Sequence, residues 1–153
     1  MKKILGLTAL VAALGCGAAP AEDARSEFRP AARVSLETPR DGICGGRATL
    51  NMYEDMFSIE CVSPMSGAHT QLIRNFTSPG RCDDVLTYTD VNGSYIVLID
   101  LGCGGIPDYV ELDNFATSTP DAVWQETYPI VTDEMNLEGA DLQWRIWDAR
   151  QRR

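Results

Sequence analysis

Alternating apolar and polar positions in the middle of the chain predict a run of short β-strands. Five segments have this pattern, and turn-rich stretches such as Ser63–Gly67 separate them. Apolar residues at every second position indicate strands with one buried face. Short connections favour pairing of consecutive strands into an antiparallel meander. The predicted strands are Arg47–Met52, Met56–Val62, Thr70–Phe76, Val85–Val91 and Ser94–Leu101.

The C-terminal third is expected to cover this sheet. Thr119-Pro120 is a good helix start, with Thr119 as the cap. Pro129 is expected to end or kink the helix. Asp141–Trp147 is compatible with a strand or a helix, and its alternating apolar residues favour a strand. The predicted fold class is therefore α+β: a disulfide-bonded antiparallel β-meander of about five strands, with a C-terminal helical segment packed on it.

The N-terminus has the layout of a secretory signal peptide, which we assign to residues 1–15. Lys2 and Lys3 precede an apolar run, Ile4–Leu14, that is too short to span a membrane as a lasting helix. The sequence Ala13-Leu14-Gly15-Cys16 resembles the lipobox of bacterial lipoproteins. This resemblance implies cleavage before Cys16 and attachment of acyl chains to that cysteine.

Such an anchor implies a location in the cell envelope, and Gly17 after the cysteine favours the outer membrane over the inner one. Several acyl chains hold a protein stably, because each buried CH₂ contributes about 0.8 kcal/mol. The alternative is ordinary signal cleavage after Ala19-Pro20-Ala21, which would give a soluble secreted protein.

Residues 16–39 are expected to be the lipidated cysteine and a flexible tether, because they are rich in Ala, Pro, Arg and Glu. Residues 40–153 suit a single globular domain. Cleavage removes both lysines, so 11 arginines (13 basic residues minus two) remain against 22 acids, a net charge of −11. This balance argues against a nucleic-acid partner, whose phosphates bind Lys and Arg.

Four cysteines remain after Cys16, and an exported chain with an even number of them indicates disulfides. Asn92-Gly93 predicts a two-residue hairpin turn that pairs Val91 with Ser94. Counting outward from that pair places Cys82 opposite Cys103, within the range of a disulfide. Cys44–Cys61 then follows by elimination. A zinc site is less favoured, because it usually needs close CxxC pairs.

The segment Asp100–Glu111 resembles the calcium loops of dockerins, EF-hands and thrombospondin-type repeats. The resemblance implies metal ligands at Asp100, Asp108 and Glu111, which match positions 1, 9 and 12 of such loops. Two positions that normally supply side-chain oxygens are glycines here. A glycine-rich turn fixed by Cys103 is therefore favoured over a calcium site.

No residue is assigned a catalytic role. His69 is the only histidine, and Ser63 and Ser66 are its neighbours in an expected loop, but no Gly-x-Ser-x-Gly nucleophile elbow is present. A histidine and a serine that are close in sequence do not make a triad.

These patterns favour a small cell-envelope lipoprotein that acts as a non-enzymatic binding or structural module. We expect its lipid anchor to hold it at a membrane, and its partner to be an envelope protein or a glycan. One alternative is a secreted calcium-dependent recognition module with a degenerate EF-type loop. Another is a small hydrolase. No cofactor is expected, and calcium is the alternative that the Asp100–Glu111 segment leaves open.

Overall fold

The computed structural model describes residues 29–78, 80–112, 115–117 and 122–153. Within these ranges the chain forms one antiparallel sheet of eight strands, in which every strand pairs with the next one in the sequence. Two helices follow the sheet. The strands are β1 (Ala32–Glu37), β2 (Arg47–Met52), β3 (Met56–Val62), β4 (His69–Ser78), β5 (Arg81–Thr89), β6 (Tyr95–Leu101), β7 (Tyr109–Leu112) and β8 (Phe115–Thr117), and the helices are α3 (Ala122–Glu134) and α4 (Leu137–Gln151).

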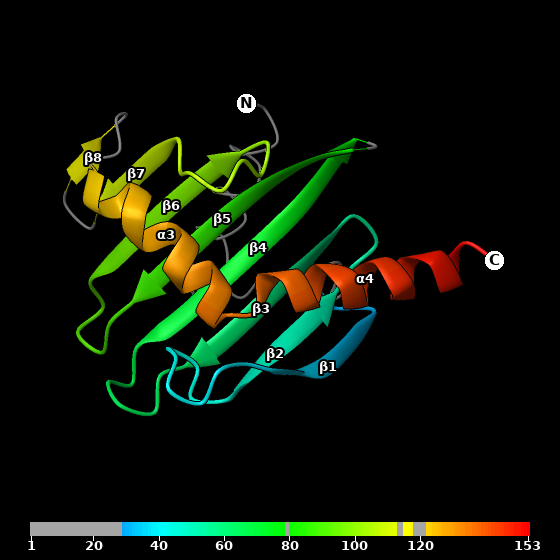
Figure 1. Cartoon of the computed structure of the whole chain (residues 1–153), viewed down its shortest axis with the longest axis horizontal. Coiled ribbons are helices and arrows are strands. Elements are labelled where there is room, and N and C mark those ends of the chain that lie inside the picture. Colours follow the sequence, from blue (N-terminus) through cyan, green and yellow to red (C-terminus); the bar gives the residue numbers. More distant parts are fainter. Residues whose placement is uncertain (1–28, 79, 113–114, 118–121) are drawn as a thin grey trace, which may run out of the picture.

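The two helices form a second layer on one face of the sheet (Figure 1). They follow each other along this face, and α4 packs over β3. Trp144 of α4 is 5% exposed, donates a hydrogen bond from Nε1 to the Tyr53 carbonyl at 3.0 Å, and stacks on Phe76 with ring centroids 4.1 Å apart. This residue fixes α4 to the sheet through both packing and a hydrogen bond.

An apolar row crosses the helix-covered face of the sheet. Its members lie opposite one another on six neighbouring strands, and none is more than 4% exposed: Leu50, Ile59, Leu72, Leu86, Leu98 and Val110. Full burial of such side chains contributes about 1.5–3 kcal/mol each. Residues two positions along a strand point to the same face. The next row on this face is Met52, Phe57, Arg74, Asp84 and Asp100, so charged side chains lie under the helix layer.

All five predicted strands are present, but the sheet has three more than the sequence indicated. β1 lies inside the predicted tether, and its Leu36 is fully buried. The boundary at residue 39 is therefore wrong, because the sheet already begins at Ala32. β7 and β8 contain four and three residues, which is too short for alternation to be recognised.

The predicted hairpin register is wrong by one residue. Thr89 lies opposite Tyr95, and the Asp90 amide donates to the Ser94 carbonyl at 2.9 Å, so the loop between Asp90 and Ser94 has one residue more than predicted. Gly93 has a φ of 88°, as expected for a three-residue hairpin loop that ends in a left-handed residue. Leu86 therefore faces Leu98 rather than Ile99, which brings Leu98 to the covered face.

Both predicted disulfides are present in the structure. Cys44 is bonded to Cys61 with a Cα–Cα distance of 5.4 Å, and Cys82 to Cys103 with 5.7 Å. The second bond forms despite the register shift, because β6 ends at Leu101 and Cys103 lies beyond the paired region with a φ of 54°. The turn after the strand, rather than a ladder position, brings Cys103 to Cys82.

The C-terminal region is more helical than predicted. Residues 141–147 belong to α4, so the predicted strand is wrong. Asn136 starts α4: its side chain accepts a hydrogen bond from the Gly139 amide at 3.2 Å, which satisfies one of the free N–H groups of the first turn. α3 continues through Pro129 to Glu134. The predicted cap Thr119-Pro120 lies outside the described residues.

Candidate functional site

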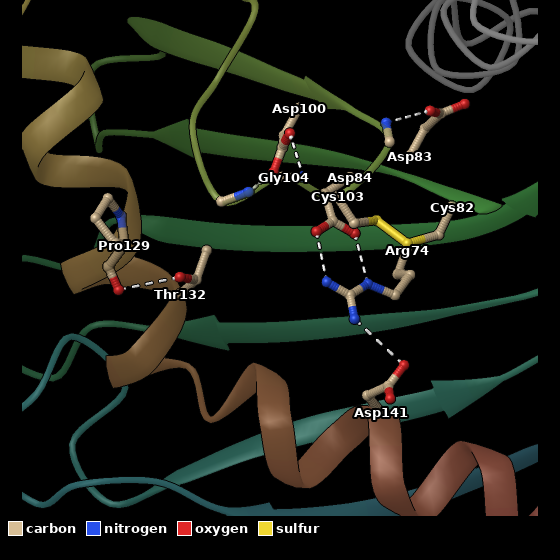
Figure 2. A network of polar contacts seen from close by, with 12 residues as sticks. Arg74, Cys82, Asp83, Asp84, Asp100, Cys103, Gly104, Pro129, Thr132 and Asp141 are labelled. Atoms are coloured by element: carbon tan, nitrogen blue, oxygen red, sulfur yellow. Dashed lines mark hydrogen bonds and ion pairs between the residues drawn. A yellow bond between two sulfur atoms is a disulfide. The ribbon is translucent and has the colours of Figure 1, made fainter. Parts of the chain in front are cut away.

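A buried ion-pair network joins the sheet to α4. Arg74 on β4 donates to both carboxylate oxygens of Asp84 on β5, from Nε at 2.8 Å and from Nη2 at 2.7 Å. Its third nitrogen, Nη1, donates to Asp141 on α4 at 3.2 Å. Figure 2 shows the guanidinium between the two carboxylates. The side chains of Arg74 and Asp84 are only 14% and 1% exposed, so this contact is made largely out of water.

The charges of this network are mutually stabilising. Burial disfavours the charged guanidinium, but the hydrogen bonds and charges of Asp84 and then Asp141 outweigh it and raise the pKa of Arg74. Asp141 also accepts from Arg145 Nε at 2.6 Å. Arg145 in turn lies over the Phe76 ring, 5.6 Å from its centroid, a distance at which a cation is attracted by the ring face.

A second buried carboxylate, Asp100, lies directly opposite Asp84 in the β5–β6 ladder and is also 1% exposed. Its two oxygens accept the amides of Gly104 at 3.0 Å and Gly105 at 2.8 Å. Among the described residues it forms no ion pair. Burial raises the pKa of Asp100, and the charges of Asp84 and Asp108 add to this against the lowering effect of the two amides.

Tyr128 of α3 completes the cluster. It is 1% exposed, and its hydroxyl lies near enough to the Asp84 carboxylate to interact with it but not in good hydrogen-bond geometry within the described part of the chain. Burial raises the pKa of Tyr128, and the charges of Asp84 and Asp100 raise it further. A buried polar atom without a partner is uncommon in folded proteins. The environment of Tyr128 is therefore the least satisfied part of this network.

The candidate calcium ligands are not gathered around one point. The oxygens of Asp100 are directed to backbone amides, and Asp108 Oδ2 accepts the Leu101 amide at 2.7 Å. Glu111 pairs with Val97, on the sheet face opposite to that of Asp100. In the described ranges, no group of three or more His, Cys, Asp or Glu side chains could hold a metal ion. The geometry thus gives the calcium hypothesis no support.

The candidate hydrolase residues are not assembled into a triad either. His69 begins β4 rather than lying in a loop, and its Nε2 is 3.7 Å from Glu60. The hydroxyl oxygens of Ser63 and Ser66 accept backbone amides of their own turn. No hydrogen bond between either serine and His69 is found in the part of the chain that the structure describes.

Cys16, the predicted lipidation site, lies outside the described residues, as does the predicted signal peptide at residues 1–15. None of the described helices is long and apolar enough to cross a membrane. No protein-family model matches the chain, and neither a curated protein nor a solved structure shows significant similarity to it.

Sequence reasoning missed the roles of Arg74, Asp84, Tyr128 and Asp141. A signal was present: Arg74 is in phase with Leu72 and Phe76, and Asp84 with Leu86. A charged residue at an apolar position of the alternation points to a buried ion pair, because unpaired charges are rarely buried. The partner on α4 could not be found this way, since that segment was expected to be a strand.

Proposed function

We propose that the protein is an exported module of the cell envelope, anchored through lipid on Cys16 and acting by binding or as a structural element rather than by catalysis. The signal-peptide layout of residues 1–15 and the lipobox resemblance support export and anchoring. The two disulfides support an oxidising compartment, because such bonds are rare in cytosolic proteins. The outer membrane is the favoured location.

The proposal that the protein does not act by catalysis is supported by the hydrogen-bond partners of the buried polar network. Arg74 is engaged on three nitrogens by Asp84 and Asp141, and both oxygens of Asp100 accept backbone amides. A catalytic group must reach a substrate, whereas these groups are buried and directed at one another. Their arrangement suits holding the helix layer on the sheet.

The test is the intact mass of the protein purified from its native envelope, with and without reduction and alkylation. We expect a chain that starts at Cys16 and carries acyl chains, with four alkylations only after reduction. An unlipidated chain that starts near Glu22 would exclude the anchor, and thiols that react before reduction would exclude the two bridges.

A further inference from the structure

The chain contains two asparagines in the sequence Asn-x-Ser/Thr, where x is not proline. They lie in the segments Asn75-Phe76-Thr77 and Asn92-Gly93-Ser94. This tripeptide is the acceptor motif for N-linked glycans, and an acceptor that is used lies in a surface loop of an exported protein. The motif alone does not choose between the two segments, but their places in the fold are very different.

Asn75 is held inside the sheet. It lies on β4, opposite Met56 of β3 and opposite Asp83 of β5. The next residue, Phe76, donates its backbone amide to the Asp55 carbonyl at 2.8 Å. An enzyme that modifies a side chain must admit the surrounding segment to its own active site, which an exposed loop allows and a strand paired on both sides does not. The folded protein therefore does not present Asn75 as an acceptor.

Asn92 lies in the hairpin loop between β5 and β6, where Asn92, Gly93 and Ser94 are all exposed. The carboxylate of Asp90, two residues before Asn92, accepts the backbone amides of Asn92 at 2.8 Å and of Ser94 at 3.1 Å. The turn is thus held by its own backbone and Asp90. Neither Asn92 nor Ser94 uses its side chain in a hydrogen bond to another described residue, so both side chains of the motif are available to an enzyme.

The hairpin lies at the end of the sheet opposite to the point where the described chain enters it. Ala32, the first residue of β1, belongs to the same cross-strand row as Met52 and Asp84. From Asp84, strand β5 continues to Thr89 before the loop begins, a length of about 17 Å at the usual rise of a strand. The loops that join β3 to β4 and β5 to β6 meet at this far end (Figure 1). A group attached to Asn92 is therefore well separated from the side where the proposed anchor joins the domain.

We propose that Asn92 carries an N-linked glycan, transferred outside the cytoplasm from an oligosaccharide that is linked to a polyprenyl diphosphate. In this step Asn92 Nδ2 forms a bond to C1 of the first sugar, and the bond between C1 and the diphosphate oxygen breaks. The polyprenyl diphosphate leaves, and one amide proton passes to a base of the transferase. Ser94 supplies the hydroxyl of the acceptor motif. The proposal rests on the export proposed above, because the transfer takes place outside the cytoplasm.

A glycan at Asn92 would also cover an apolar part of the surface. Val91 is 70% exposed, and Met65 in the neighbouring β3–β4 loop is 94% exposed. The two loops are in close contact, since a Cβ added to Gly67 would lie 2.9 Å from Val91 Cγ1. Exposed apolar side chains that gather on one surface favour contacts between molecules. A bulky, solubilising glycan on this turn counteracts such contacts.

The test is peptide mapping by mass spectrometry of the full chain purified from its native envelope and reduced. Trypsin cleaves after arginine, so it separates the two motifs into the peptides Asn75–Arg81 and Cys82–Arg145. We expect the second peptide to carry a sugar mass that fragmentation places on Asn92, and the first peptide to have its unmodified mass. An unmodified second peptide, or a sugar on Asn75, would overturn the assignment.

Matched variants test the acceptor motif itself. Asn92→Gln and Ser94→Ala should each abolish the sugar mass, whereas Ser94→Thr keeps the hydroxyl and should retain it. Asn75→Gln is the control and should leave the sugar mass unchanged. A sugar that persists in Asn92→Gln or in Ser94→Ala would show that another residue or another kind of transfer is responsible, which would also overturn the proposal.

The same spectra separate this proposal from the proposed function, because they report the first residue of the chain and its acyl chains. A chain that is anchored through Cys16 and has both bridges but no sugar on Asn92 would exclude the glycan and leave the proposed function intact. A glycosylated chain that starts near Glu22 without acyl chains would do the reverse.

Discussion

Arg74 and Asp84 form a two-point ion pair between β4 and β5, with nitrogen–oxygen distances of 2.8 and 2.7 Å. They are also direct cross-strand neighbours, so the backbone ladder sets the separation of their side chains. Two parallel hydrogen bonds make such a pair stronger and more directional than a single contact. Because Arg74 also reaches Asp141, the same guanidinium fixes the position of α4.

Arg74→Met should destabilise the fold strongly. Removing one partner of a buried pair leaves an uncompensated charge and costs about 3–5 kcal/mol. The measurement is the free energy of unfolding in urea at neutral pH. Arg152→Met is the matched control: Arg152 also pairs with an aspartate at 2.9 Å, but its side chain is 72% exposed, and exposed pairs contribute about 0–1 kcal/mol. Equal losses in the two variants would show that Arg74 acts only as a surface residue.

Trp144→Ala should loosen α4 from the sheet. The ring is 5% exposed, stacks on Phe76 and donates to the Tyr53 carbonyl. Loss of a buried aromatic side chain costs about 3–5 kcal/mol. Leu142→Ala on the same helix, where the side chain is 60% exposed, should change stability by less than about 0.5 kcal/mol. Urea unfolding compares the two, and similar values would show that α4 packs with another face.

The sheet could be predicted where alternation was long and clear. Arg47–Met52 and Met56–Val62 have the bounds that the sequence indicated. Strand β1 could not be predicted from alternation. Its apolar residues Val34 and Leu36 lie in a segment rich in proline and arginine, and only pairing with β2 makes this segment a strand. The predicted hairpin register was wrong because Asn92-Gly93 is compatible with a three-residue loop as well as with a two-residue one. The choice between the two loops depends on the packing of Leu98 rather than on the turn residues.

The buried network could be predicted only in part. Arg74 and Asp84 interrupt apolar alternation, which indicates a buried pair but does not name the partners. Asp100 was noticed as a candidate calcium ligand because of its spacing to Asp108 and Glu111. The structure uses its carboxylate to cap the glycine turn instead. Contacts between α4 and the sheet join residues as far apart as 91 positions, and no local pattern carries that information.

The two disulfides should differ in their effect on stability. The bridged residues are separated by 17 positions in Cys44–Cys61 and by 21 in Cys82–Cys103, so the entropic contributions are nearly equal, each about 2–4 kcal/mol. Cys44 and Cys61 are 5% and 8% exposed and belong to the core. Replacing this pair by alanine also leaves a cavity and should destabilise more. Urea unfolding of the two double-alanine variants measures the difference, and a greater loss for Cys82–Cys103 would contradict this ranking.

Asn136 should be important for the junction between the two helices and β1. Its side chain accepts from the Gly139 amide at 3.2 Å and donates to the Glu37 carbonyl at 2.8 Å, while its backbone is left-handed with a φ of 56°. Asn136→Ala loses both hydrogen bonds and keeps a β-carbon in the left-handed region, which alanine tolerates less well than asparagine, so we expect a loss of about 1–3 kcal/mol. Asn136→Gly loses the same bonds without the strain and should be less harmful by about 1–2 kcal/mol. Thermal unfolding monitored by circular dichroism separates the two contributions.

Asn92→Ala in the exposed hairpin loop is the control and should be near neutral. If the alanine and glycine variants of Asn136 were equally stable, the left-handed backbone would not be required, and the hydrogen bonds alone would account for the effect.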